Sequence, residues 1–226
     1  MEEKLIVYED NNILICNKPV GVASQSERGF ETDLLSMVLT YRTGRNEPAY
    51  AAIINRLDKP VGGLVLFAKD KKTAAALSAL SGEHSIEKHY YAVVEGKLEE
   101  KGEFTDYLLK DPKGNLSRIV TENTPGAKKA RLMYEPIENR EIDGIVYTLV
   151  KIRLLTGRHH QIRVQFSGHG HPLYGDMKYN GRFEGQRGVS PALFAYSLSF
   201  NNPAGVERIS VEVRPQGDIW NFEYFR

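Results

Sequence analysis

The hydrophobic pattern of the chain is dominated by short apolar runs that are separated by polar turns. These runs are rich in β-branched and aromatic residues, which is typical of β-strands. Two other stretches lack this pattern: residues 104–126 are polar and rich in turn residues, and residues 128–131 fit either a basic strand or a loop. The predicted strands are residues 5–8, 13–16, 64–68, 87–96, 146–155, 194–200 and 208–213.

Two segments have the apolar spacing of an amphipathic helix. Residues 32–41 place apolar side chains three and four positions apart, with Thr32 or Asp33 at the N-terminal cap. Residues 70–81 are rich in alanine and end before Gly82. Because strands outnumber helices and occur in clusters, the pattern predicts an α+β fold with a mostly antiparallel sheet.

The composition is that of an ordinary globular protein. No change in composition, Gly/Ser-rich linker or internal repeat divides the chain, so we expect one domain over residues 1–226. No apolar stretch approaches the roughly 18 residues that span a membrane, and the N-terminus lacks the pattern of a signal peptide. The single cysteine, Cys16, excludes an intrachain disulfide, and its apolar surroundings predict a buried thiol. We therefore expect a cytoplasmic monomer with no membrane and no protein partner.

The distribution of charge is more informative than the net charge of +1. Between Lys151 and Arg187 there are seven Lys and Arg residues but only two acidic residues, Asp176 and Glu184. Four of the six histidines fall in the same interval. This asymmetry predicts one basic face.

Asp58 is the first candidate for chemistry. It follows Leu57 in a turn marked by Pro60 and the pair Gly62-Gly63, and the apolar run 64–68 comes next. A carboxylate at the mouth of a buried strand is partly desolvated and can be reactive. A turn aspartate that caps its own backbone fits the same residues. This stretch by itself leaves both interpretations open.

A second candidate region has two arginines, Arg158 and Arg163, around a His-His-Gln centre. Residues five apart point to opposite faces of a strand, and they lie about 140° apart on a helix. We therefore expect different partners for them, one a phosphate and the other an internal carboxylate, both of which suit an arginine. A solvated basic face is the alternative interpretation.

The four histidines in this interval do not match a zinc pattern. Zinc sites commonly use tight helical spacing or a carboxylate at a defined offset. We expect no metal, and we expect these side chains to donate to phosphates or to loop carbonyls. The four residues are His159, His160, His169 and His171.

Several stretches together resemble the RluA-type pseudouridine synthases. NRLD with GLVLFAK, at residues 55–69, is similar to the family's H-R-L-D…S-G-L-L-L-F-A-K. KHYYAVVEG, at 88–96, is similar to K-x-Y-x-A-x-V-x-G. TGRHHQIRV and GHPLYGD, within 156–176, are similar to T-G-R-x-H-Q-I-R-V…G-H-P-I-x-G-D. With the opening strand and K-P-x-G turn at 7–21, the resemblance covers nearly the whole chain.

The resemblance implies an enzyme that isomerises specific uridines in ribosomal or transfer RNA to pseudouridine. Asp58 matches the catalytic aspartate, which either adds to the nucleoside or takes a ribose proton. Tyr90 matches the tyrosine that packs on the target base and is a candidate for proton removal at carbon 5. Arg163 matches the residue that pairs with the catalytic aspartate, which would keep Asp58 ionised.

The same resemblance implies structured RNA as the partner. A target base must leave its stack before a carboxylate can reach it, which requires an aromatic platform and cationic contacts to the backbone. Arg56 and Arg158 are the candidate RNA contacts, with Lys18 and His160 as further candidates. Because the reaction is an isomerisation, we expect no redox cofactor and no metal.

The chain departs from the family pattern in three places. Asn55 replaces a histidine, and residues 59–63 lack the hydroxyl residue of the commoner turn, although Pro60 could stiffen the loop instead. The run 158–160 has histidine where threonine or serine is common. The chain also begins directly at the catalytic domain, so we expect target recognition without an additional N-terminal RNA-binding domain.

Two rival functions remain open at this point. The altered turn after Asp58 is the one feature that fits a catalytically inactive RNA-binding protein of the same fold. A carboxylate-based hydrolase of nucleosides or sugars would need a second acidic residue near Asp58. Asp176 could serve only if the fold brought it close.

Overall fold

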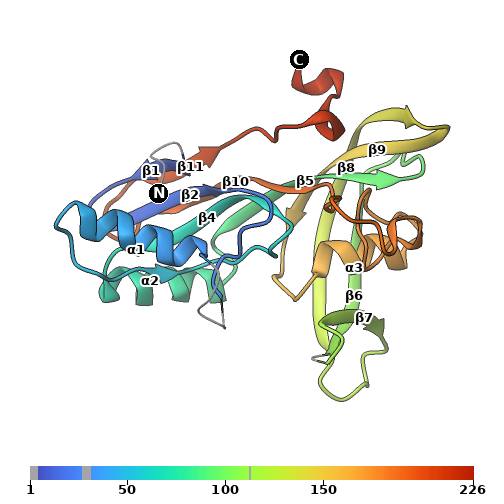
Figure 1. The fold of residues 1–226 in the computed structure, drawn as a ribbon. Helices are drawn as coiled ribbons and strands as arrows, with labels where there is room; N and C mark the ends of the chain where they lie inside the picture. Colours follow the sequence, from blue (N-terminus) through green and yellow to red (C-terminus); the bar gives the residue numbers. More distant parts are fainter. Residues whose placement is uncertain (1–4, 27–31, 112) are drawn as a thin grey trace. The chain divides into compact units, whose positions relative to one another are not determined.

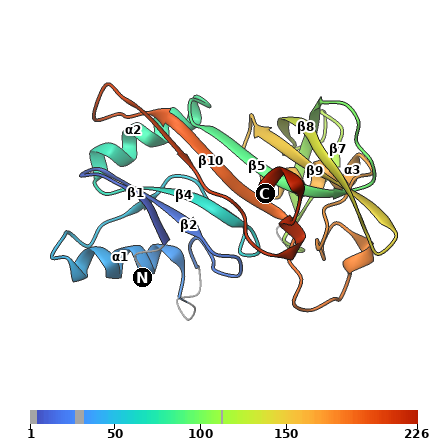
Figure 2. The ribbon, with the colours of Figure 1, turned by 90° about the horizontal axis from the view of Figure 1, so that it is seen from above.

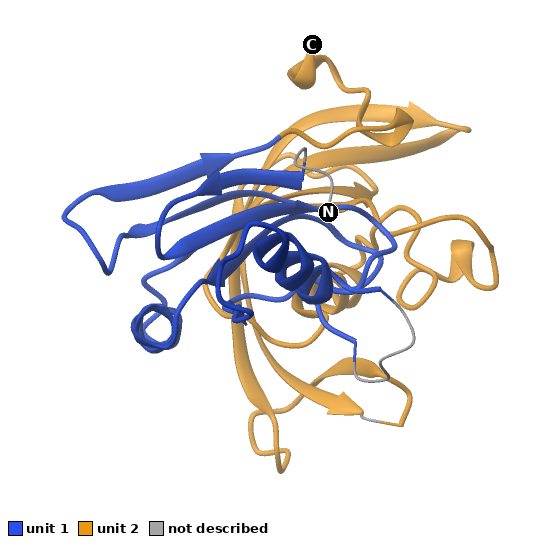
Figure 3. Cartoon of the chain, turned by 60° about the vertical axis from the view of Figure 1, so that its left-hand side comes forward, with its two compact units in different colours: residues 1–87, 195–213 blue, residues 88–194, 214–226 orange. Residues whose placement is uncertain are grey.

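The computed structural model describes residues 5–26, 32–111 and 113–226. The chain folds as two compact units, neither of which is continuous in sequence (Figure 3). Unit 1 comprises residues 1–87 and 195–213, and unit 2 comprises residues 88–194 and 214–226. The single domain expected over residues 1–226 stays a prediction. No change in composition marks these boundaries, and one of them falls within strand β10, Leu193–Asn201, which begins in unit 2 and ends in unit 1.

A β-sheet with the order β1-β2-β4-β10 forms the centre of unit 1 (Figure 1). The short strand β3 pairs antiparallel with β4, and β11 pairs antiparallel with β10. Every residue of β4 is buried, so the predicted apolar strand is confirmed. The bounds are β1 Ile6–Glu9, β2 Ile13–Lys18, β3 Ala52–Ile53, β4 Gly62–Ala68 and β11 Arg208–Glu212.

Helices α1, Leu34–Gly44, and α2, Lys71–Gly82, lie on opposite sides of this sheet (Figure 2). Both predicted helices are confirmed, and aspartates cap them: Asp33 accepts from the Ser36 N–H and Asp70 from the Thr73 N–H. In the described part of the chain, no helix is long and apolar enough to cross a membrane.

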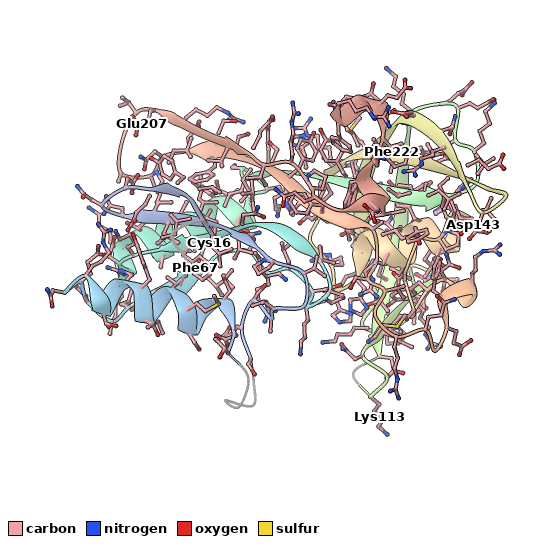
Figure 4. The ribbon with its side chains drawn as sticks, turned by 45° about the horizontal axis from the view of Figure 1, so that its top comes forward. Cys16, Phe67, Lys113, Asp143, Glu207 and Phe222 are labelled. Atoms are coloured by element: carbon pink, nitrogen blue, oxygen red, sulfur yellow. The ribbon has the colours of Figure 1, made fainter. Side chains whose placement is uncertain are left out.

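The two faces of the unit 1 sheet carry separate apolar layers. The layer that includes Leu77 of α2 consists of Ile13, Ile15, Leu64, Leu66, Ala68, Leu77, Ile86, Leu198, Phe200 and Ile209. Cys16 and Phe67 lie on the side that faces α1 (Figure 4). The prediction of a buried thiol is confirmed, and burial raises the pKa of Cys16 to about 12.

Lys69, the last residue of the GLVLFAK stretch, is buried and belongs to an ion network with partly exposed carboxylates. Its Nζ lies 2.7 Å from a carboxylate oxygen of Glu9 and 3.2 Å from one of Glu47. Arg42 of α1 donates to Glu47 through Nε at 3.0 Å and to the Lys69 carbonyl through Nη1 at 2.8 Å. Burial raises the pKa of Glu47, but the hydrogen bonds from Arg42 and Lys69 outweigh it and lower that pKa. The network joins α1 to the ends of β1 and β4.

The sheet of unit 2 has the order β5-β9-β8-β6-β7, and these neighbouring strands are antiparallel. The expectation of an α+β fold with a mostly antiparallel sheet is confirmed. Strands β5 and β9 were predicted almost to the residue. The bounds are β5 Glu87–Glu95, β6 Gly102–Asp111, β7 Leu116–Val120, β8 Lys128–Ile142 and β9 Ile145–Leu154.

The polar stretch at residues 104–126 contains most of a β-hairpin that its sequence did not reveal. Strands β6 and β7 pair antiparallel to form this hairpin, and Lys113 lies at its tip (Figure 4). Apolar residues occur only sparsely in β6, where Phe104 and Leu108 are buried and most of the other side chains are at least partly exposed. A strand that buries so few side chains shows little of the alternation on which sequence prediction depends.

Helix α3, Gln161–Gly168, packs against β6 and β7 of unit 2. Its Phe166 contacts Phe104 and Tyr134 edge to face, with ring centroids 5.1 and 5.6 Å apart. The described part of the chain also includes three short 3-10 helices, Gly181–Phe183, Asp218–Trp220 and Glu223–Phe225. The structure therefore settles that Arg163 lies on a helix, whereas Arg158 lies in the loop before it.

Asp70 offers a test of the cap on α2. Hydrogen bonds from the hydroxyl and N–H of Thr73 lower the pKa of Asp70 to about 2. We expect Asp70→Ala to lower the free energy of unfolding by about 1 kcal/mol at pH 7. Because the unfolded pKa is about 3.9, the contribution is complete above that pH and is lost as pH falls toward 2. Urea unfolding at pH 7 and pH 3 checks this, and an equal loss at both would contradict it.

Gly63 offers a test of the close approach between β4 and β10. Its φ is +116°, and a Cβ there would lie 2.2 Å from the carbonyl oxygen of Ala195. We expect Gly63→Ala to destabilise the protein by on the order of 3 kcal/mol, because backbone has to move. Gly82→Ala is the control, since a Cβ there meets nothing within 4 Å. If thermal unfolding showed equal effects for both variants, the close approach would not matter.

Candidate active site

Asp58 lies half-buried in the loop that joins β3 to β4. Asn55 holds the start of this loop with its side-chain amide. Its Nδ2 donates to the Leu64 carbonyl at 3.1 Å, and its Oδ1 accepts from the Leu66 N–H at 2.8 Å. The amide therefore extends the pairing of β3 with β4 beyond the last backbone pair. Asn55, which stands where the family pattern has histidine, therefore positions the start of the loop.

The peptide groups on both sides of Asp58 are hydrogen-bonded. The hydroxyl of Ser24 donates to the Leu57 carbonyl at 2.9 Å and accepts from the Leu57 N–H at 3.0 Å. The carbonyl of Asp58 accepts from the Val61 N–H at 2.9 Å, which closes the turn. A hydroxyl thus does bind this loop, although it comes from 33 residues upstream of Leu57.

Lys18 binds the residue that follows Asp58. Its side chain is fully buried, and its Nζ donates to the carbonyls of Pro19, Val22 and Lys59 at 3.0, 2.6 and 3.3 Å. Burial lowers the pKa of Lys18 to about 8, and the negative charge of Asp58 opposes this shift. Its ammonium is thus enclosed among backbone carbonyls, and the expectation that Lys18 contacts RNA stays a prediction. Its spacing in K-P-x-G could not reveal whether it points inward.

Tyr90 lies on β5 in unit 2 and is 6% exposed. It pairs with Ile152 of β9, which in turn pairs with Tyr134 of β8. Directly opposed residues share a sheet face, and Tyr134 contacts Phe166 of α3. Tyr90 therefore lies on the face that α3 covers.

Tyr91 points the other way, as strand alternation predicts. Its ring contacts those of Tyr224 and Phe225 near the C-terminus, and its hydroxyl lies 3.2 Å from that of Tyr224. Glu138 holds the same segment by accepting from the N–H groups of Glu223 and Tyr224. The adjacent tyrosines thus have different surroundings.

Arg163 forms a buried, bidentate ion pair with Asp176. Its Nε and Nη2 each lie 2.7 Å from a carboxylate oxygen, and the two residues are 3% and 0% exposed. The expectation that one arginine of the motif reaches an internal carboxylate is confirmed. Asp58 belongs to unit 1 and Arg163 to unit 2, so their expected pairing stays a prediction.

Tyr179 connects this ion pair to the β6–β7 hairpin and was not recognised from the sequence. The Arg163 guanidinium lies 5.3 Å from the centre of its ring. Its hydroxyl accepts from the Ser117 N–H at 2.7 Å and lies 2.8 Å from Nδ1 of His160. The segment GHPLYGD signals Asp176, but no pattern singles out a tyrosine three residues later.

His160 is buried and begins α3 with a left-handed backbone, φ 53°. Its Nδ1 bonds to the Tyr179 hydroxyl, and the expected contact of His160 with RNA stays a prediction. The candidate RNA contacts Arg56 and Arg158 differ from it. Arg56 is exposed, and Arg158 is half-buried with its Nε donating to the Lys129 carbonyl at 2.9 Å.

Each of the four histidines has its own partners. His159 bonds to Ser117 and Asn115, His169 lies 3.1 Å from a carboxylate oxygen of Asp106, and His171 bonds to the Glu95 carbonyl. Across residues 5–26, 32–111 and 113–226, no three His, Cys, Asp or Glu side chains form a group that could hold a metal ion.

Asp176 does not suit the acid of a two-carboxylate hydrolase. Its Oδ2 accepts from Arg163, and its Oδ1 accepts from Arg163 and from the N–H groups of Lys178 and Tyr179. Both oxygens are therefore occupied by hydrogen-bond donors within unit 2. A carboxylate whose two oxygens are engaged in this way is a structural partner of Arg163.

The sequence is similar to those of several named pseudouridine synthases. The chain is 33% identical to an uncharacterized RNA pseudouridine synthase of Bacillus subtilis, over 78% of this chain and 57% of that protein. It is 31% identical to ribosomal large subunit pseudouridine synthase D of Neisseria meningitidis, over 96% and 59%. It is 29% identical to tRNA pseudouridine synthase C of Haemophilus ducreyi, over 91% and 88%.

The fold is shared with a solved human structure, RNA pseudouridylate synthase domain containing 1. That likeness has a TM-score of 0.77 at 23% identity and covers 93% of this chain and 82% of the other. The chain spans less than two thirds of the length of the Bacillus and Neisseria relatives. The family model described as RNA pseudouridylate synthase matches residues 12–168, more than half of the sequence. The chain therefore belongs to the RNA pseudouridylate synthase family, and its relatives place it in the RluA type that its motifs indicated.

Proposed function

We propose that this chain converts specific uridines in ribosomal or transfer RNA to pseudouridine. The observation that carries the proposal is the Asp58 loop, in which a half-buried carboxylate is held through the peptide groups around it. This loop lies within the stretch that the family model matches. The RNA class is supported by relatives that are named for the ribosomal large subunit and for tRNA.

The reaction needs no atoms beyond those of the nucleoside and a proton. The bond from ribose C1′ to uracil N1 breaks, the uracil turns, and a bond from C1′ to C5 forms. The proton on C5 leaves and N1 gains one, so nothing is oxidised or reduced. In this proposal, the carboxylate of Asp58 engages the nucleoside so that the first bond breaks.

Tyr90 and Arg163 complete the proposed site. Tyr90 packs on the flipped base, and because it is only 6% exposed, this role requires its ring to be uncovered when RNA binds. Arg163 pairs with Asp58 and orients its carboxylate. Since Asp176 engages its Nε and Nη2, this second pairing would use Nη1.

The proposed contacts to the RNA backbone are Arg56 and Arg158. Arg56 is exposed two residues before Asp58, and Arg158 is partly exposed before α3. Cationic side chains at these positions attract phosphates, and the target base must leave its stack to reach the carboxylate. The alternative hypothesis, an inactive RNA-binding protein, depends on the altered turn after Asp58. Ser24 and Lys18 hold that turn by hydrogen bonds to the carbonyls of Leu57 and Lys59.

Tritium release tests the function. RNA from a strain that lacks the gene is labelled at C5 of uridine and incubated with the native protein and with Asp58→Asn. We expect release by the native protein and a loss of at least about 1,000-fold in the variant, because a neutral amide cannot replace the carboxylate. Pseudouridine mapping of the product then identifies the position.

Asp70→Asn is the matched control for this experiment. It also removes one carboxylate from unit 1, but asparagine caps a helix as well as aspartate does. Full release is expected for this control, and filter binding should show that Asp58→Asn still binds RNA. Native-level release by Asp58→Asn would overturn the assigned role of Asp58. Absence of release by the native protein on both RNA classes would overturn the function.

Arg163 can be tested for a role beyond stability. We expect Arg163→Met to lower the free energy of unfolding by about 3–5 kcal/mol, because Asp176 is left buried and unpaired. The double variant Arg163→Met/Asp176→Leu should regain much of that stability. Denaturant unfolding and tritium release are measured on both. If the double variant also regained activity, Arg163 would act only as the partner of Asp176.

A further inference from the structure

The direction in which the Asp58 side chain points depends on two peptide planes. The plane between Leu57 and Asp58 is anchored at the Leu57 carbonyl by the Ser24 hydroxyl. The plane between Asp58 and Lys59 is anchored at the Asp58 carbonyl by the Val61 N–H. Because peptide groups are planar, fixing the planes on both sides of a Cα sets φ and ψ there, and with them the direction of Cβ.

The next peptide group is also anchored. The Lys59 carbonyl accepts from the Gly21 N–H at 2.9 Å and from Nζ of Lys18 at 3.3 Å. The anchors at Leu57 and Lys59 therefore both come from residues 18–24, which begin at the last residue of strand β2. This segment forms hydrogen bonds with the loop on either side of Asp58, whereas the Val61 N–H that binds the Asp58 carbonyl belongs to the loop itself.

Ser24 has a special place in this arrangement. It is 4% exposed, and its one hydroxyl serves both the N–H and the C=O of Leu57. Residues 55–63 contain no serine or threonine, so no hydroxyl within the loop can do the same. We propose that Ser24 is a positioning residue for Asp58, an inference that rests on the proposed function and deepens it.

The expected consequence is a loss of turnover rather than of RNA binding. A reacting group misplaced by about 1 Å can cost on the order of 100-fold in rate. Because Ser24 is buried, its hydroxyl acts on the reaction only through the loop in this proposal. A lower kcat with an unchanged KM for RNA is therefore the result that this role predicts.

The test compares Ser24→Ala with Ser199→Ala. Ser199 is also a buried serine of unit 1, and its hydroxyl accepts from Arg208 at 2.8 Å and bonds to Glu87 at 3.3 Å. Both variants lose one buried hydroxyl, and we expect them to lower the Tm by similar amounts. Only Ser24→Ala should lose roughly 10- to 100-fold in kcat, with an unchanged KM for RNA. Equal kcat values in the two variants would overturn the proposal.

Hydrogen exchange of the Leu57 amide gives a readout without RNA. This N–H is bonded to Ser24, so its exchange should accelerate in Ser24→Ala and stay at the native rate in Ser199→Ala. Ser24→Cys retains a weaker hydrogen-bonding group and should lie between native and Ser24→Ala in both exchange and kcat. It also serves if Ser24→Ala does not fold. Unchanged exchange in these Ser24 variants would show that the hydroxyl does not hold the loop.

The two proposals fail in different ways. If the native protein released no tritium, the proposed function would fail, whatever the exchange rate at Leu57. If the native protein is active and Asp58→Asn is inactive, but Ser24→Ala retains full kcat, the function stands and the positioning role falls. Accelerated exchange together with reduced kcat supports both.

Discussion

The anchoring of the peptide groups around Asp58 is the constraint on which the proposed chemistry depends. It requires that the segment after β2 lie beside the loop before β4, and the pairing of these strands brings this about, because Lys18 pairs with Gly63. Gly63 in turn packs its backbone directly on Ala195 of β10. Three residues thus act on the same loop: the buried Ser24, the buried Lys18, and Gly63, which has no space for a side chain. None of the three touches the nucleoside in the proposed reaction.

Unit 2 is organised around a different interaction, the buried pair of Arg163 with Asp176. A buried ion pair repays its desolvation only with good geometry and further hydrogen bonds. Here both oxygens of Asp176 are occupied, and the guanidinium lies over the ring of Tyr179. The Tyr179 hydroxyl then reaches Ser117 on the β6–β7 hairpin and His160 at the start of α3. Helix, hairpin and loop are therefore held in one polar network.

Several charged residues that the motifs single out have internal tasks in this structure. Lys69 joins Glu9 and Glu47, and Lys18 binds backbone carbonyls. Both are buried, which costs free energy unless each ammonium finds acceptors. Placement in a family motif therefore does not distinguish a residue that meets the substrate from one that shapes the loop beside it. The exposed Arg56 is of the first kind in our proposal, and Ser24 is of the second.

The sequence by itself determined the class of fold, the family, both capped helices and most strands, because apolar periodicity and N-caps are local signals. It also singled out Asp58, Tyr90 and Arg163, whose roles stay predictions. Only the tertiary structure decided that Asp176 is the partner of the Arg163 fork, that Lys18 and His160 are internal, and that residues 104–126 contain a hairpin. It also showed that the hydroxyl of Ser24, 33 residues before Leu57, bonds to the backbone of this loop. The physical reason is that hydrogen bonds between distant segments leave no periodic trace along the chain, whereas burial of a helix or strand face does.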